Sequence, residues 1–172
     1  MVNIIQATPK DLPEILDIQK RVFEEVARFM GKNELPPLMQ TVEDLQNELQ
    51  NGIILKYFLD DSSIIGSVRG TLDKENVCHI GKLIVDSNFQ NKGIGASLMY
   101  EIENYFPSCE KFTLFTGSET PNTVHLYKKL GYYITGEQDT KGITMLLMEK
   151  QNNSKRVHPR IPAISILSNF KI

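Results

Sequence analysis

The stretch HIGKLIVDSNFQNKGIGASLMYEIENYF, residues 79–106, decides the fold. It opens with an apolar run at residues 80–85, which predicts a buried strand, and a polar turn follows at residues 86–90. Its last part carries Leu98, Ile102 and Phe106 at helical spacing. The stretch therefore predicts a strand, a loop that contains glycines and an amphipathic helix, in that order.

The loop between this strand and this helix has the composition of an anion-binding site. N–H groups at the start of a helix lack partners and carry the positive end of the helix dipole. Gly93 and Gly95 have no Cβ to hold a ligand away from the backbone, and Lys92 adds a positive charge. The loop therefore predicts a site for a phosphate or a diphosphate.

Two common phosphate-binding patterns do not fit this loop. Leu98 stands where the pattern G-x-G-x-x-G needs its third glycine, and the pattern G-x-x-x-x-G-K-[ST] is absent. What remains is Q-x-x-G-x-G-A, which begins at Gln90 and follows a strand that ends Leu83-Ile84-Val85. Here the chain resembles the GNAT superfamily of N-acetyltransferases, which use acetyl-coenzyme A. The resemblance covers about residues 3–150.

Composition narrows the class of protein. The chain has 172 residues, of which 41% are hydrophobic and 23% charged, as expected of one soluble globular domain. A net charge of −2 argues against a nucleic-acid or anionic-membrane partner, and no apolar run approaches the roughly 20 residues of a membrane span. Without a signal-peptide pattern, Cys78 and Cys109 are expected to be reduced and buried in a cytoplasmic protein.

Outside the central stretch, short apolar runs alternate with helical patterns. Thr8-Pro9 and Thr41 with Asp44 have the residues of helix starts, and Gly131 that of a helix end. Pro36-Pro37 predicts a break at residues 31–37. Strands are expected at residues 2–7, 53–59, 64–71, 77–85, 111–116, 132–137 and 143–149. Helices are expected at residues 9–26, 41–50 and 120–130, in addition to the central helix that ends at residue 106.

This order of elements predicts a mixed α/β domain, antiparallel in its first half and parallel around the central helix. The resemblance implies the acyl-CoA N-acyltransferase (GNAT) fold, a twisted central sheet of about seven strands flanked by about four helices. The domain is expected over residues 1–150. Residues 151–172 are expected either to be a partly disordered end or to pack as an arm on this or a neighbouring subunit.

The resemblance also implies acetyl-CoA as co-substrate, with no metal. In the superfamily the strand before the loop is splayed from its neighbour, so its backbone can pair with pantetheine and one strand N–H can polarise the thioester oxygen. The implied cofactor-binding residues of the strand and the loop are Leu83, Ile84, Val85, Gln90, Asn91, Lys92, Gly93, Ile94, Gly95 and Ala96. The alternative for the strand residues is that they are only buried core.

A second segment, TPNTVHLYKKLGY at residues 120–132, is similar to the superfamily segment N-x-x-A-x-x-L-Y-x-x-L-G-[FY]. The resemblance makes Tyr127 the proton donor to the departing thiolate, although it could be only a core tyrosine. A phenol of pKa about 10 keeps its proton at neutral pH. Thr120 stands where the superfamily has a pantetheine-binding asparagine, although it could be only an N-cap. Asn122 and Tyr127 complete the candidate cofactor-binding residues, but Asn122 lies two residues later, about 200° around the helix, so its identity alone does not give it the pantetheine role.

The acceptor amine needs a base. An amine of pKa about 10.4 costs about 4.6 kcal/mol to deprotonate at pH 7. The glutamate that some relatives carry after the central helix is missing, since Phe115 and Thr116 stand there. His79 is the candidate base, because it stands where another branch has a glutamate on the central strand; the alternative is a hydrogen-bonded histidine of the scaffold. Strand alternation places four residues on one face: His79, Gly81, Leu83 and Val85.

The acceptor site is expected at residues 24–40 and 138–142, where acids would suit a cationic amine unless they only form a solvated face. These acids are Glu24, Glu25, Glu34, Glu137 and Asp139. The predicted function is acetyl transfer to a primary amine of a small molecule or a peptide by direct attack in a ternary complex, in a possible homodimer. The alternatives are a regulatory module that binds acyl-CoA with little catalysis, and another phosphate-ligand transferase.

Overall fold

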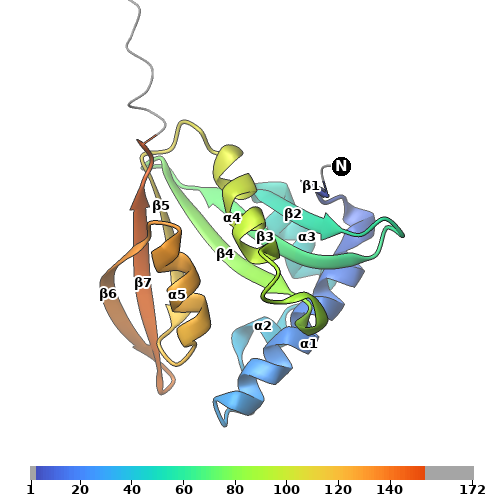
Figure 1. Cartoon of the computed structure of the whole chain (residues 1–172), viewed down its shortest axis with the longest axis horizontal. Coiled ribbons are helices and arrows are strands. Elements are labelled where there is room, and N and C mark those ends of the chain that lie inside the picture. The colour runs from blue at the N-terminus through green and yellow to red at the C-terminus, as the bar shows by residue number, and fades with distance from the viewer. Residues whose placement is uncertain (1–2, 154–172) are drawn as a thin grey trace, which may run out of the picture.

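Seven strands form one mixed sheet in the computed structural model, which describes residues 3–153 (Figure 1). The strand order is β1-β2-β3-β4-β5-β7-β6, and every neighbouring pair is antiparallel except β4 and β5. The elements are β1 (Ile4–Gln6), η1 (Pro9–Asp11), α1 (Leu12–Phe29), α2 (Pro36–Met39), α3 (Val42–Asn51), β2 (Ile53–Phe58), β3 (Ile64–Leu72), β4 (Val77–Val85), η2 (Ser87–Phe89), α4 (Ile94–Asn104), β5 (Lys111–Gly117), α5 (Pro121–Lys129), β6 (Tyr133–Thr140) and β7 (Ile143–Gln151). The predicted mixed α/β fold is confirmed.

Helices cover both faces of the sheet. In Figure 1, α4 and α5 lie in front of it, and α1 and α3 lie behind it. The front core contains Leu98, Met99 and Ile102 of α4, and the back core contains Ile15 and Ile18 of α1, all fully buried. Each helix turns one apolar stripe to the sheet, and this burial is the main force that holds the layers together.

The break predicted at residues 31–37 contains a short helix that the sequence reasoning missed. Helix α2 begins at Pro36, with Leu35 as its N-cap. Proline fits the first turn of a helix because the N–H that it lacks would have no partner there. The protein thus has five α-helices within the described residues 3–153, one more than expected.

The packing of the domain continues slightly beyond residue 150. Strand β7 continues to Gln151, and Asn152 is buried, with its Nδ2 donating to the Cys109 carbonyl at 3.0 Å. Both cysteines are buried and unbridged. Most of the predicted tail, residues 154–172, lies outside the described residues.

Strands β4 and β5 run together only at their beginning. Val77, Cys78 and His79 pair with Lys111, Phe112 and Thr113, and no later residue of β4 pairs with β5. The two strands then diverge toward the lower end of Figure 1. On its other edge, β4 stays paired with β3 up to Val85. One edge of the second half of β4 therefore has no strand beside it.

A β-bulge corrects the alternation that the sequence predicted for β4. Opposite β3, Ser67 pairs with Ile84 but Arg69 pairs with Gly81, so β4 holds an extra residue here, and Lys82 has φ 50°. Before the bulge Cys78 and Ile80 face the front core, and after it Leu83 and Val85 do. His79 and Gly81 therefore lie on the back face, opposite Leu83 and Val85, and the prediction of one shared face was wrong.

Candidate active site

Side chains hold the loop between β4 and α4 in place. Asp86, at the end of β4, accepts hydrogen bonds from the Asn88 N–H at 3.0 Å and from Arg21 of α1 at 2.8 Å. Gln90 donates from Nε2 to the Val85 carbonyl at 3.0 Å, which ties the end of the loop to the end of the strand. Asn91 then takes φ 59° and Gly93 φ 82°, both left-handed, and these two turns of the backbone lead into α4.

This loop presents a row of free donors. Within residues 3–153, none of the backbone N–H groups from Asn91 to Ala96 donates to another residue, and the first that does is Ser97, which bonds the Gly93 carbonyl at 3.0 Å. A Cβ on Gly93 would meet no atom within 4 Å, so the space beside the loop is open. Free N–H groups at a helix start are the requirement of an anion site, and the sequence-predicted loop meets it.

Lys92 of the loop and Gly95 in the first turn of α4 have neighbours that the sequence did not indicate. The Lys92 ammonium lies 5.2 Å from the centre of the Phe89 ring, a cation–π contact that draws the charge toward the start of the loop. A Cβ on Gly95 would lie 3.4 Å from Leu126 of α5. This is ordinary van der Waals distance, so Gly95 lies where α4 contacts α5, and what it can offer a ligand is its backbone N–H.

The strand residues predicted to bind pantetheine all lie in the half of β4 that β5 leaves unpaired. The side chain of Ile84 is fully buried in the back core, and those of Leu83 and Val85 are partly buried against the front core. Their side chains are thus core residues, as the alternative expected, and only their backbone can serve a ligand. That role stays a prediction.

Tyr127 is largely buried on α5. Its side chain is 6% exposed, and its ring meets that of Tyr132 edge-on, with the centroids 6.0 Å apart. No described residue hydrogen-bonds its hydroxyl, whereas the Tyr132 hydroxyl donates to Glu103 at 2.8 Å. Burial raises the pKa of Tyr127 above that of an ordinary phenol, so the side chain keeps its proton at neutral pH.

Thr120 occupies the N-cap position of α5 but does not cap it with its side chain. Its hydroxyl donates to the Gly117 carbonyl at 2.6 Å and lies 3.4 Å from the Thr116 hydroxyl. The Thr120 oxygen can still accept a hydrogen bond from a ligand. Asn122 is exposed on α5, two residues further. The pantetheine roles of both residues stay predictions.

His79 is already engaged at both ring nitrogens. Nε2 lies 2.6 Å from an Asp73 carboxylate oxygen and Nδ1 lies 2.8 Å from the Thr113 hydroxyl. His79 also belongs to the last pair that joins β4 to β5, so it lies where the two strands are still closed. To accept a proton from a substrate it would first have to break one of these bonds. Glu75, between β3 and β4, and His125 of α5 are both exposed.

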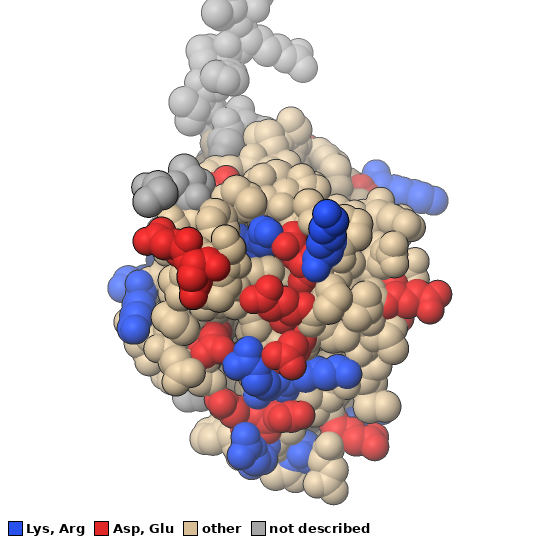
Figure 2. Space-filling view, turned by 90° about the vertical axis from the view of Figure 1, so that its right-hand side faces the viewer, with Lys and Arg blue, Asp and Glu red and all other residues tan. Residues whose placement is uncertain are grey.

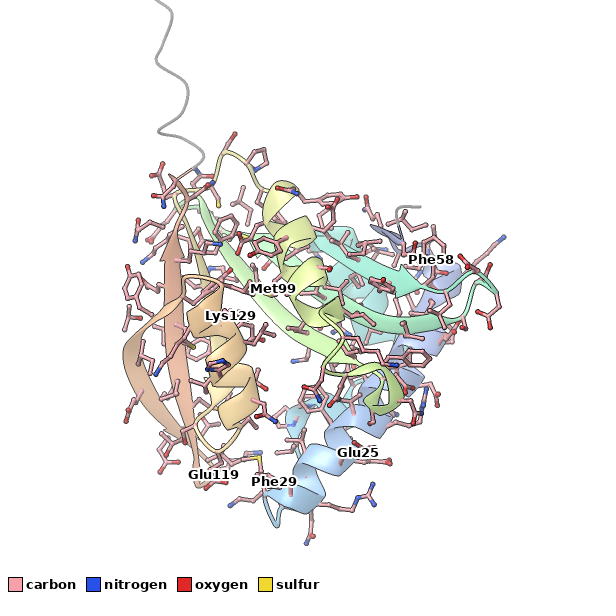
Figure 3. The ribbon with its side chains drawn as sticks, in the orientation of Figure 1. Glu25, Phe29, Phe58, Met99, Glu119 and Lys129 are labelled. Carbon is pink, nitrogen blue, oxygen red and sulfur yellow. The ribbon has the colours of Figure 1, made fainter. Side chains whose placement is uncertain are left out.

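The two segments expected to form the acceptor site do meet. A Cβ on Gly142, in the turn between β6 and β7, would lie 3.4 Å from Nζ of Lys32, which follows α1. Phe29 at the end of α1 and Glu119 before α5 lie at the same lower end of the molecule (Figure 3). The acids expected to attract a cationic amine are all exposed, namely Glu24, Glu25, Glu34, Glu137 and Asp139.

A buried polar cluster on the back face escaped the sequence reasoning. Arg69 of β3 is 5% exposed and bonds Gln19 of α1, Gln40 and Glu48 of α3, and the ammonium of Lys82 lies near this group. One signal for this cluster was present in the sequence, since Arg69 stands within a strand of mostly apolar residues. A charged residue in such a strand is buried only when it has partners. Which distant residues supply those partners is not visible in the sequence.

Other features of the surface add no second candidate. In the view of Figure 2, cationic and acidic side chains are mixed, without the continuous basic patch of a nucleic-acid interface. Among the described residues, no three His, Cys, Asp or Glu side chains are grouped as metal ligands would be. No helix in residues 3–153 has the length and apolar character that crossing a membrane requires.

Comparisons with known proteins agree with this geometry. The chain is 26% identical over 108 residues to the uncharacterized protein YdhI of Bacillus subtilis (strain 168), an alignment that covers 62% of this chain and only 60% of YdhI. A GNAT-family acetyltransferase of Streptococcus pneumoniae matches the structure with a TM-score of 0.68 and 24% identity, over 86% of this chain and 98% of that one. The PaiA N-acetyltransferase of Thermoplasma acidophilum in complex with coenzyme A matches with a TM-score of 0.72 and 20% identity, over 86% and 97%.

The family model agrees with the fold and with the loop. The acetyltransferase (GNAT) family model matches residues 13–132, a range that contains all of α1 except its first residue, the bulged and half-paired strand β4, the loop of free N–H groups and helix α5 with Tyr127. The match thus covers more than half of the chain and includes the open edge of β4. This chain belongs to the acetyltransferase (GNAT) family.

Proposed function

We propose that this chain is an N-acetyltransferase that moves the acetyl group of acetyl-CoA to a primary amine by direct attack in a ternary complex. The observation that carries the proposal is the junction of β4 and α4, where free N–H groups adjoin a strand edge that β5 leaves open. The first feature suits a diphosphate and the second suits a chain of amides such as pantetheine. The coenzyme A in the Thermoplasma acidophilum structure supports this choice of ligand.

The described residues divide the binding of acetyl-CoA between them. The N–H groups of residues 91–96 would hold the diphosphate, and the open edge of β4 near Leu83 and Val85 would pair with pantetheine. The bound thioester supplies an activated acetyl group. A β4 N–H directed at the carbonyl oxygen would stabilise the negative charge that forms there during attack.

Tyr127 would act as the general acid. Attack forms a bond between the amine nitrogen and the acetyl carbon and breaks the carbon–sulfur bond. The phenol proton goes to the departing sulfur, and the second proton that the nitrogen loses on becoming an amide passes to solvent. The hydroxyl has no partner among the described residues, so donation breaks no bond within the protein, and solvent returns a proton to the oxygen afterwards. Such a group contributes about 10²–10⁴-fold to the rate.

The proton of the acceptor ammonium must leave before attack. The sequence predicts His79 for this role, and its bonds to Asp73 and Thr113 mean that one of them must open first. A water molecule that passes the proton to solvent is the other route. Neither route needs a covalent enzyme intermediate, and Cys78 and Cys109 are both too buried to supply one.

A thiol-release assay over a panel of amines tests the proposal. Free coenzyme A is measured with a thiol reagent, and the two buried cysteines should contribute little background in the folded protein. Sustained release with any amine supports the transferase and excludes a pure binding module. Calorimetric binding of acetyl-CoA without release from any amine would favour the regulatory module, and preference for ATP or NAD would refute the coenzyme assignment.

A further inference from the structure

The guanidinium of Arg69 is the centre of the back-face cluster. Arg69 donates through one terminal nitrogen to Glu48 at 2.5 Å and to Gln40 at 3.2 Å, and through the other to Gln19. The Nε atom of Arg69 is buried and has no hydrogen-bond partner among the described residues. Gln19 is itself fully buried and donates to Gln40, so the group is held rigidly by α1 and α3.

Lys82 adds a second cation beside this group. It is the bulged residue of β4, has φ 50°, and makes no ion pair within residues 3–153. Left-handed backbone at a lysine is costly, and bulges of this kind occur often beside active sites. His79 is the last residue of β4 that pairs with β5. Lys82 lies three residues further along β4 and is therefore beside the open edge.

Arg69 and Lys82 share a single carboxylate, that of Glu48, among the described residues of the cluster. Burial lowers the pKa of the Lys82 ammonium, the charge of Arg69 lowers it further, and Glu48 only partly opposes them. Glu48 is the one acid that the cluster contains, and it is already paired with Arg69. Two cations and one carboxylate leave a net positive charge in a partly desolvated position.

Open space adjoins Lys82 on the same face. A Cβ on Gly81 would meet no atom within 4 Å, and Gly81 itself is exposed. By alternation this space lies on the back face, whereas α4 and the N–H groups of its loop belong to the front. A second substrate can therefore reach the open edge of β4 from the face opposite the coenzyme site.

We propose that the acceptor amine carries a carboxylate and that Lys82, beside Arg69, binds it. This inference rests on the proposed function and names the substrate class of the same site. A free amino acid and a peptide that ends or begins with an acidic group share this chemistry. A polyamine lacks the carboxylate, and its second ammonium would face Lys82 without an acid beside it. The acids that the sequence suggested for attracting a cationic amine are all exposed.

Matched acceptors test the inference directly. The ω-amino acids from glycine to 6-aminohexanoate are compared with the alkylamines from methylamine to pentylamine, which lack only the carboxylate, and with the α,ω-diamines. Acetyl transfer is followed by release of free coenzyme A. For at least one chain length we expect kcat/KM to be about tenfold or more higher for the amino acid than for its alkylamine, with the diamine lowest.

Variants at residue 82 assign the preference to Lys82. In Lys82→Met the ratio between the amino acid and its alkylamine should fall toward one, and in Lys82→Glu it should reverse in favour of the diamine. Lys82→Arg keeps the charge and should keep most of the ratio. Lys10→Met removes an exposed lysine far from β4 in the sequence and should leave the ratio unchanged. The affinity for acetyl-CoA, measured by calorimetry, should stay the same in all four variants.

The outcomes separate this inference from the proposed function. Release of coenzyme A with alkylamines or diamines as fast as with amino acids, or a ratio that Lys82→Met leaves unchanged, would overturn the inference while the transferase stands. A fall in acetyl-CoA affinity in Lys82→Met would place Lys82 in the coenzyme site and also overturn it. If no amine is acetylated, the amino acids are tested for binding to the complex of the protein with coenzyme A. A lack of binding overturns the inference.

Discussion

Two tyrosines in edge-to-face contact should respond to the same substitution in opposite ways. Tyr127 and Tyr132 lie with ring centroids 6.0 Å apart, and both are buried. The Tyr132 hydroxyl donates to Glu103 at 2.8 Å, and Glu103 also pairs with Lys150 at 2.7 Å. The Tyr127 hydroxyl has no partner among the described residues. Replacing each by Phe removes one hydroxyl and keeps the ring, so the pair is its own control.

The magnitudes follow from these contacts. A hydrogen bond to a charged group contributes about 1.5–3 kcal/mol, so Tyr132→Phe should lower the free energy of unfolding by that amount. Tyr127→Phe breaks no hydrogen bond within the protein and should change it by less than about 0.5 kcal/mol. Loss of a general acid costs about 10²–10⁴-fold in rate, so Tyr127→Phe should lower kcat by that factor while Tyr132→Phe keeps most of it.

Urea unfolding and steady-state thiol release, both at pH 7, measure the two effects, and calorimetry checks that each variant still binds acetyl-CoA. The expected result is a crossover, in which one variant loses rate and the other loses stability. Equal turnover in Tyr127→Phe and the parent protein would refute the proton-donor role. A large loss of stability in that variant would show that its hydroxyl has a partner and would refute the reasoning from the structure.

Three further predictions use the same assays. Gly93→Ala and Gly31→Ala both place a Cβ at positive φ with no atom within 4 Å, so each should cost about 1 kcal/mol of stability, but only Gly93→Ala should weaken coenzyme A binding; equal affinities would contradict the anion site. His79→Gln should lower kcat/KM by less than about threefold, because both ring nitrogens serve the scaffold, and a 10²-fold loss would restore it as the base. Lys82→Met should raise the free energy of unfolding at pH 7 by about 0.5–2 kcal/mol, since it removes a poorly compensated cation. Because burial and then Arg69 lower the Lys82 pKa, the gain should shrink as pH rises from that lowered pKa toward about 10.4, and it should vanish well above about 10.4, where the parent lysine is neutral in both the folded and the unfolded state. A gain that grows with pH would contradict this.

Local signals in the sequence were enough to predict most of the helices and strands and the loop between β4 and α4. Thr41 and Asp44 form the capping box that their spacing indicates, and the strand from residue 77 to residue 85 has the predicted bounds. Asn91 and Gly93 give the loop its left-handed turns within a few residues. Such features are decided between neighbours in the chain, so their pattern can be read without the fold.

Features that depend on distant residues differ from what local patterns indicated. Gly95 lies in a sequence typical of a ligand-binding loop, and the fold also places it against Leu126 of another helix, where a Cβ would be in van der Waals contact at 3.4 Å. Helix α2 follows a break because Pro36 can begin a helix as well as end one. In each case the sequence permits two structures, and packing against a remote segment selects one.

The sequence by itself determined the family, the order of the elements and the loop that offers its N–H groups, because glycine positions, caps and apolar periodicity act over a few residues. Only the tertiary structure decided where β4 parts from β5, how the bulge at Lys82 reverses the faces of the strand, and which groups surround Arg69. The charge around Arg69 and Lys82 results from segments far apart in the chain, and electrostatic energy depends on their distance in space rather than along the sequence.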